Sequence, residues 1–230
     1  MSSEAEQGQL PLLFLCRFVS GFRDIFILWR VYVSICKIIN ILIIFAAIII
    51  NRGDFMKIVL NAGHTKSGAG SGAVGYLNES EETRKIVSLI RYYLRGKGHE
   101  VILANVDKAE SQSAYLYSVA RKANKEIDVD LFVSVHLNAG GGNGCECYTW
   151  KGDESAAAVG ICEELSALGF RNRGVKDGSH IYVISKTKMP AVLVEAFFVD
   201  SMADVKNYKC LGSKVAQAIT RGILKQVELV

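Results

Sequence analysis

The chain has 230 residues, half of them hydrophobic, and a formal net charge of +4. This length allows one globular domain with a sizeable core, plus an additional segment. The charge excess is mild and no basic stripe is interleaved with aromatic residues, so we expect no nucleic-acid partner, although an anionic polymer would be compatible.

Residues 1–55 form a hydrophobic N-terminal segment. Within it, residues 31–50 are an apolar stretch interrupted by Lys37 and Asn40, close to the roughly twenty residues that span a bilayer. Basic residues lie before or within this stretch, and Arg52 alone closely follows it. As a signal anchor, the stretch would provide a membrane contact and leave the rest of the protein outside the cytoplasm.

A second interpretation of this segment begins from Met56, which stands directly before the first expected strand. Residues 1–55 would then be an upstream extension from a mis-called gene start. The protein would begin at Met56 and stay in the cytoplasm until lysis. The residues alone leave both interpretations open.

From residue 56 onward the chain alternates between short apolar runs and helical patterns. A strand over Lys57–Ala62 precedes a glycine-rich loop and a helix that begins after Asn78 and stops at Gly96. The remaining predicted elements are strands at His99–Ala104, Leu131–Val135, Gly144–Trp150, Ile181–Ile184 and Ala191–Glu195, and helices at Ser113–Lys125, Ser155–Leu168 and Lys214–Val227. This alternation predicts a single α/β domain over residues 56–230, with a mostly parallel central sheet covered by helices on both faces.

Six cysteines occur at irregular spacing, without a Cys-x-x-Cys pair. Cys145 and Cys147 would face the same side of their predicted strand, because side chains alternate along a strand. We interpret them as reduced packing residues, with a soft-metal pair as the alternative.

Four side chains able to bind a metal or transfer protons lie at the ends of predicted elements. His64, His136 and Glu195 end apolar runs, and Glu79 opens a helix. In sheets of this class, ligands bind where strands end. A catalytic zinc takes three His or carboxylate ligands and keeps one position for water. His64, Glu79 and His136 could form such a set, with Glu195 free to accept a proton.

Each of these residues also has a purely structural interpretation. His64 could cap a turn, Glu79 could complement a helix dipole, and His136 could be a hydrogen-bonded core residue. Glu195 is the hardest to explain structurally, because a carboxylate in so apolar a run is costly to bury unless it is paired or functional.

Taken together, several sequence blocks resemble the zinc N-acetylmuramoyl-L-alanine amidases of the type 3 class, most closely the catalytic domains of clostridial phage endolysins. The resemblance covers residues 56–230, and its blocks are Asn61–His64, Asn78–Glu79, Ser134–Ala139, Arg173–Lys176 and Pro190–Phe198. It implies zinc on His64, Glu79 and His136, with Glu195 as the catalytic glutamate. It also selects Glu79 over the neighbouring glutamates of the same helix, which spacing could not do.

The resemblance implies hydrolysis of the amide bond between the muramic acid lactyl group and L-alanine in peptidoglycan. We expect a phage or prophage endolysin, acting as a monomer on the cell wall. The alternatives are a bacterial autolysin for growth, division or spore release, an inactive peptidoglycan-binding module, or a zinc peptidase that cuts the stem peptide. From their positions, Asn138 and Arg173 are expected to orient the glycopeptide.

Overall fold

A computed structural model of the chain describes residues 29–35, 37–39, 41 and 55–227. The chain divides into two compact units, Met1–Arg52 and Gly53–Val230. In the first unit the described residues are helical and mostly exposed. No helix among the described residues is both long and apolar enough to cross a membrane. The rest of the 31–50 stretch, together with residues 1–28, lies outside the described residues.

The second unit is built on a six-stranded sheet with the strand order β2-β1-β3-β6-β4-β5. Only the pairing of β4 with β6 is antiparallel among these strands. The mostly parallel sheet predicted from the sequence is therefore confirmed. The strands are β1 (Lys57–Ala62), β2 (Glu100–Leu103), β3 (Leu131–Asn138), β4 (Cys145–Thr149), β5 (Asn172–Asp177) and β6 (Ala191–Phe198).

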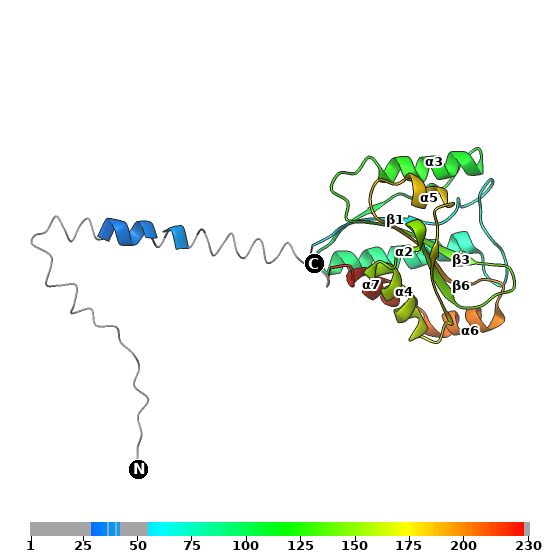
Figure 1. Cartoon of the computed structure of the whole chain (residues 1–230). Helices are drawn as coiled ribbons and strands as arrows, with labels where there is room; N and C mark the ends of the chain where they lie inside the picture. Colours follow the sequence, from blue (N-terminus) through cyan, green and yellow to red (C-terminus); the bar gives the residue numbers. More distant parts are fainter. Residues whose placement is uncertain (1–28, 36, 40, 42–54, 228–230) are drawn as a thin grey trace, which may run out of the picture. The chain divides into compact units, whose positions relative to one another are not determined.

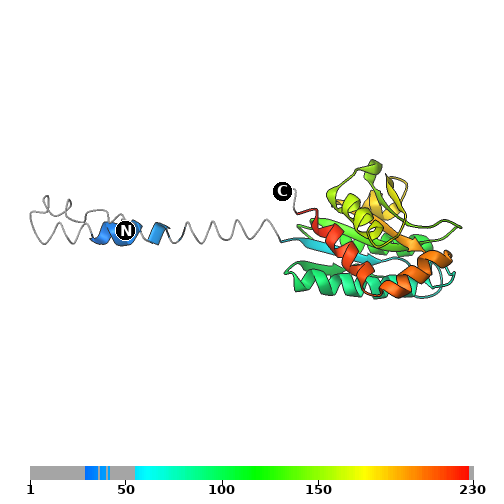
Figure 2. The ribbon, with the colours of Figure 1, turned by 90° about the horizontal axis from the view of Figure 1, so that it is seen from below.

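Helices cover both faces of this sheet. One face carries α3 (Gln112–Ala123) and α5 (Tyr182–Lys186), and the other carries α2 (Glu79–Gly96), α4 (Ala156–Ser166) and α7 (Lys214–Leu224) (Figure 1). Seen from below, α7 lies between α2 and α4 (Figure 2). A 3₁₀ turn, η2 (Trp150–Gly152), follows β4, and α6 (Met202–Leu211) follows β6.

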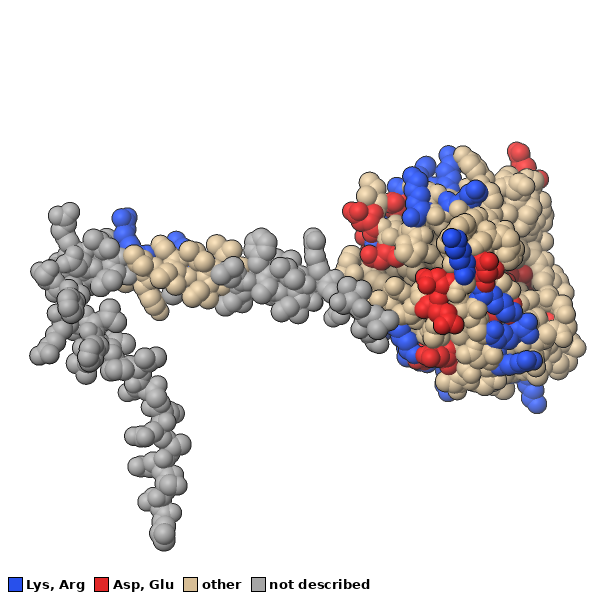
Figure 3. All heavy atoms as spheres, viewed as in Figure 1, with Lys and Arg blue, Asp and Glu red and all other residues tan. Residues whose placement is uncertain are grey.

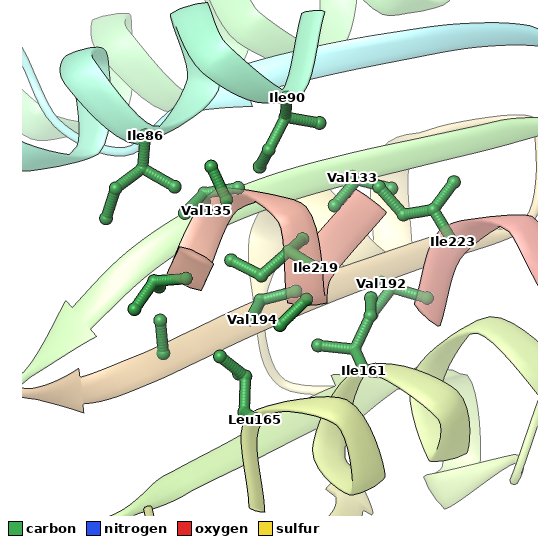
Figure 4. Close-up of a cluster of buried hydrophobic side chains, with 14 of the residues drawn as sticks. Ile86, Ile90, Val133, Val135, Ile161, Leu165, Val192, Val194, Ile219 and Ile223 are labelled. Carbon is green, nitrogen blue, oxygen red and sulfur yellow. The ribbon is translucent and has the colours of Figure 1, made fainter. Parts of the chain in front are cut away.

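The larger hydrophobic cluster lies between the sheet and the three helices α2, α4 and α7 (Figure 4). The central strands contribute apolar side chains to both faces, as expected for parallel strands that are covered on both sides. Close helix packing in this layer depends on a glycine, because a Cβ at Gly222 would lie 2.4 Å from the backbone nitrogen of Ile161. Residues from all three helices and two strands meet here: Ile86, Ile90, Val133, Val135, Ile161, Leu165, Val192, Val194, Ile219 and Ile223.

One predicted strand is wrong. Residues Ile181–Ile184 were expected to be extended, but they enter helix α5. Val183 and Ile184 pack against the sheet in the smaller hydrophobic cluster, so a short apolar run satisfies burial as a helix. Periodicity does not distinguish the two states over four residues.

Strand β5 and helix α6 had no prediction. Strand β5 has the sequence Asn-Arg-Gly-Val-Lys-Asp, which lacks an apolar run because it forms an edge of the sheet. Helix α6 carries few buried side chains, and its start is marked mainly by Ser201, whose hydroxyl accepts from the Asp204 backbone N–H at 3.3 Å.

Candidate metal centre

The four candidate residues lie where the parallel strands end, and we call this C-terminal end of the strands the edge of the sheet. His64 lies at the start of the loop that follows β1, Glu79 is the first residue of α2, and His136 and Glu195 lie near the ends of β3 and β6. Strands β3 and β6 are longer than predicted, so His136 and Glu195 lie inside them as direct register partners. The edge is the one at which ligands bind in open α/β sheets.

Three of these side chains form a compact triangle. The distances are 3.0 Å from His64 Nε2 to Glu79 Oε1, 3.1 Å from His136 Nδ1 to Glu79 Oε1, and 3.2 Å between the two histidine nitrogens. A tetrahedral zinc site with bonds of about 2.0–2.1 Å places its ligand atoms about 3.3–3.4 Å apart. The spacing and the donor types therefore fit such an ion. Within the part of the chain that the structure describes, no other group of three metal-capable side chains was found.

Hydrogen bonds from the backbone hold the triangle in position. His64 Nδ1 donates to the Gly70 carbonyl at 3.0 Å, which turns Nε2 toward the triangle. Glu79 Oε2 accepts from the Ala73 N–H at 2.9 Å, and its Oε1 accepts from the Leu137 N–H at 3.1 Å. Both side chains are thus oriented before any ligand arrives.

The protonation states of the triangle also suit a metal. Burial alone would raise the pKa of Glu79, but hydrogen bonds from His136 and His64 outweigh it and hold this pKa well below its usual value. Burial lowers the pKa of His136, so its ring is neutral near pH 7. An anionic carboxylate and a neutral imidazole are the forms that bind metal ions.

The backbone around the triangle is shaped to admit these side chains. A Cβ at Gly63 would lie within 2.5 Å of the His136 ring, and one at Gly72 would lie 2.8 Å from both Glu79 Oε2 and the His64 ring. His64 itself has a φ of 68°, a left-handed conformation that is uncommon for residues other than glycine. Such strain persists where the surrounding structure holds it, often at functional sites.

Glu195 lies beside the triangle without belonging to it. Its Oε2 atom is buried and has no hydrogen-bond partner among the described residues. Burial, together with the negative charges of Glu79 and Glu146, raises the pKa of this carboxyl well above its ordinary value. A half-buried carboxyl with one buried, unsatisfied oxygen next to a metal-capable cluster is typical of a group that transfers protons.

Glu146 is a third acidic residue at this edge, and the sequence analysis did not single it out. It lies on β4 as the register partner of Glu195, and its side chain is 2% exposed. Its carboxylate accepts from Asn138 Nδ2 at 3.0 Å, from the Tyr148 hydroxyl at 2.9 Å and from Arg173 Nε at 2.6 Å, and it also pairs with Lys176. Asn138 and Arg173, the two predicted substrate-orienting residues, therefore meet at Glu146.

The charge of Glu146 is stabilised by these partners. Burial would raise its pKa, but the bonds from Arg173, Lys176 and Tyr148 outweigh burial and keep the pKa below its ordinary value. The sequence did carry a signal for this residue. Glu146 stands between two cysteines in a short strand, so the argument that singled out Glu195 applies to it equally.

Comparison with known proteins agrees with this geometry. The family model for N-acetylmuramoyl-L-alanine amidases matches residues 58–225. The chain belongs to this amidase family. The predicted resemblance to type 3 amidases is thereby confirmed, and so is the fold, since solved amidase domains share it.

Individual relatives show how far the similarity extends. An uncharacterized protein of Clostridium perfringens is 33% identical over 186 residues, covering 75% of this chain and 53% of that protein. The N-acetylmuramoyl-L-alanine amidase CwlM of Bacillus licheniformis is 33% identical over 171 residues, covering 73% of this chain and 65% of that amidase. The solved catalytic domain of the CD27L endolysin targeting Clostridia difficile superposes with a TM-score of 0.68 and 30% identity, covering 74% of this chain and 97% of that domain.

The chain spans about half the length of the curated Clostridium perfringens relatives, 53% and 52%. In contrast, it covers nearly all of the solved endolysin catalytic domain. The shared part is therefore the amidase domain itself.

Proposed function

We propose that this protein is a zinc-dependent N-acetylmuramoyl-L-alanine amidase, which hydrolyses the amide bond between the muramic acid lactyl group and L-alanine of peptidoglycan. The observation that carries the proposal is the triangle of His64, Glu79 and His136 beside the unpaired carboxyl of Glu195, in a domain of the amidase family. A zinc ion is proposed because two histidines and one glutamate are a ligand set that zinc hydrolases use.

In this proposal His64, Glu79 and His136 hold the zinc. When bound, zinc would polarise the substrate carbonyl and lower the pKa of water to about 7. Glu195 is the general base, whose carboxylate accepts the proton of the attacking water. It then returns that proton to the departing nitrogen of L-alanine. The environment that raises the pKa of Glu195 suits both halves of this exchange, because the group can hold the proton between them.

Asn138 and Arg173 are proposed to orient the glycopeptide. Both donate to Glu146, so their side chains are held at the same edge of the sheet as Glu195. A restrained donor loses less conformational entropy when it binds a substrate.

The proposal is tested by digesting purified peptidoglycan with the protein and measuring freed L-alanine amino groups and reducing sugar ends, with and without a chelator. We expect new alanine termini without new reducing ends, lost on chelation and restored by zinc. Amino termini of residues other than alanine would instead indicate a stem-peptide peptidase. Retention on the wall without release of either group would indicate a binding module.

We further propose that the amidase acts as an endolysin, a monomer that degrades the cell wall. The similarity to the CD27L endolysin domain supports this role, since the chain covers 97% of that domain. The second candidate is an autolysin, favoured by the apolar stretch at residues 31–50 if it is a signal anchor. Mass spectrometry of the native amino terminus separates them: a start at Met56 supports the endolysin, and a membrane-bound protein starting at Met1 supports the autolysin.

A further inference from the structure

Four neighbouring strands bring a line of charged side chains to the edge of the sheet. His136 on β3, Glu195 on β6 and Glu146 on β4 are successive register partners. Strand β5 continues the line, because its register with β4 shifts around Glu146 and leaves Arg173 at that level. Paired residues of adjacent strands point to the same face of a sheet. The line therefore runs from the candidate metal centre outward to the edge strand.

The outer end of this line is a cationic pair, Arg173 and Lys176. Both contact the carboxylate of Glu146, so two positive charges share one negative charge. The side chains of Arg173 and Lys176 are 27% and 35% exposed, while that of Glu146 is 2% exposed. The buried carboxylate thus lies beneath two cations that reach solvent, and the group keeps a net charge of +1.

The guanidinium of Arg173 is held so that part of it stays available. Its Nε donates to Glu146, and its plane lies over the Phe198 ring, 5.1 Å from the ring centre. Within the described residues neither Nη atom has a hydrogen-bond partner. A guanidinium with two free Nη groups binds a planar carboxylate through paired hydrogen bonds, and fixing the group beforehand reduces the entropy lost on binding.

The distance from the catalytic carboxylate to this pair matches the substrate. Strands lie about 4.8 Å apart, so β5 is about 10 Å from β6. An extended peptide advances about 3.5 Å per residue, which places a carboxylate on the second residue of the stem peptide about 7 Å from the bond that is cut. Side chains as long as arginine and lysine span the difference.

We propose that Arg173 and Lys176 form a subsite for the free carboxylate of the second stem-peptide residue, a glutamate joined to the next residue through its side chain. Glu146 is the positioning residue of this subsite, because it is buried and holds both cations. The inference rests on the proposed amidase function. The subsite would then determine which type of cell wall the amidase cleaves, since some walls carry the same residue with its carboxylate amidated.

The test compares two soluble substrates that differ in one group. Both are N-acetylmuramoyl tripeptides with L-alanine first, and the second residue is either γ-linked D-glutamate or its α-amide. We expect the zinc-loaded full chain to prefer the carboxylate substrate by about 10- to 100-fold in kcat/KM, mostly through KM, as for a charge-assisted bidentate contact. Arg173→Gln and Lys176→Gln should each reduce this preference. Arg173→Lys keeps the positive charge but should lose part of the preference, because lysine cannot make the paired hydrogen bonds.

The matched control is Lys188→Gln. Lys188 is exposed and precedes the start of β6, so it lies at the end of this strand that is remote from Glu195. It should leave the preference between the two substrates unchanged. Equal rates for both substrates in the unmodified protein would overturn the subsite. Equal losses on both substrates in the Arg173 and Lys176 variants would also overturn it, since they indicate a structural role. Failure of the unmodified protein to release L-alanine termini from either substrate would instead refute the proposed function.

Discussion

Three glutamates at one edge of the sheet are placed in three different environments. Glu79 accepts from two histidines and two backbone N–H groups. Glu146 is surrounded by an amide, a phenol and two cations, whereas one oxygen of Glu195 has no partner among the described residues. Identical side chains therefore suit a metal ligand, a positioning residue and a proton-transfer group, because hydrogen bonding and burial set their charge states.

The unpaired carboxyl oxygen of Glu195 lets us predict the effect of replacing this residue. Glu195→Gln removes the proton acceptor but keeps the size of the side chain and all three proposed metal ligands. We expect kcat to fall by about 10²- to 10⁴-fold with the zinc content unchanged. Glu154→Gln, at an exposed position, is the control. The zinc content is measured by elemental analysis, and turnover near the wild-type rate would refute the assignment of Glu195.

The surroundings of Glu146 predict a pH-dependent contribution to stability. Its pKa in the folded protein lies below the ordinary value of 4.5, so the stabilisation is fully present above pH 4.5 and is lost as pH falls toward the folded pKa. Glu146→Gln should lower the free energy of unfolding by about 1–3 kcal/mol at neutral pH, and this difference should shrink below pH 4.5. Denaturant unfolding in the presence of a chelator measures the free energy of unfolding of both proteins at neutral pH and below pH 4.5. A difference that does not change with pH would mean that the charge of Glu146 is not its source.

At the scale of elements, the loop after β1 and the start of α2 assemble the metal centre. Strand β1 places Gly63 and His64 beside β3, and the Gly63 N–H donates to the Val135 carbonyl at 2.8 Å. The Asn78 side chain caps α2 by accepting from the Glu81 N–H, which fixes where the helix begins and so where Glu79 lies. One strand end and one helix start thus determine two of the three proposed ligands.

This close packing predicts that Gly63→Ala weakens metal binding. The new methyl group would lie 2.5 Å from the His136 ring, so the ring must move away from the triangle. We expect zinc affinity to fall by about 10- to 100-fold, as for other changes that disturb ligand orientation. Gly96→Ala, near the end of α2, meets no atom within 4 Å and is the matched control. Competition with a chromogenic chelator measures both affinities, and equal affinities would show that the ring position does not depend on Gly63.

Over the whole second unit, positive and negative side chains are interspersed on the face shown in Figure 3. The charged pairs that matter for the proposed substrate contacts are instead concentrated where β4 and β5 meet, beside the candidate metal centre. The proposed metal joins β1, α2 and β3, which are separated by long stretches of sequence. Metal binding should therefore stabilise the tertiary structure as a whole.

We expect zinc to raise the thermal midpoint of unfolding, because a ligand that binds only the folded state adds about 2.7 kcal/mol at a concentration 100-fold above its Kd. Chelation should reverse the shift. Glu79→Ala should abolish the shift, whereas Glu154→Gln should retain it. Differential scanning calorimetry measures the shifts, and an equal zinc shift in Glu79→Ala would exclude the triangle as the binding site.

The division into two units predicts that residues 56–230 fold and act alone. Their core is built between the sheet and helices α2, α4 and α7, all of which lie within this range. We expect the truncated protein to match the full chain in thermal midpoint within a few degrees and in kcat/KM on soluble substrate. Loss of cooperative unfolding after truncation would show that residues 1–55 contribute to the domain.

Much of this protein can be predicted from its sequence because the deciding signals are local. Apolar runs, helix caps and glycines place most of the strands and helices, and their ends point to His64, Glu79, His136 and Glu195. The resemblance of the ordered sequence blocks also indicated the amidase family, which the match to residues 58–225 confirmed. The short apolar run at Ile181–Ile184 was the exception, since burial satisfied it equally well as a helix.

The tertiary structure alone decided which residues become neighbours. The polar edge strand β5 has no apolar signal, and its pairing with β4 brings Arg173 and Lys176 to Glu146 across about thirty residues of sequence. The register of β4 against β6 likewise places Glu146 opposite Glu195. Register is set by the packing of whole strands and not by any single residue, so the charged line along this edge exists only once the sheet has formed.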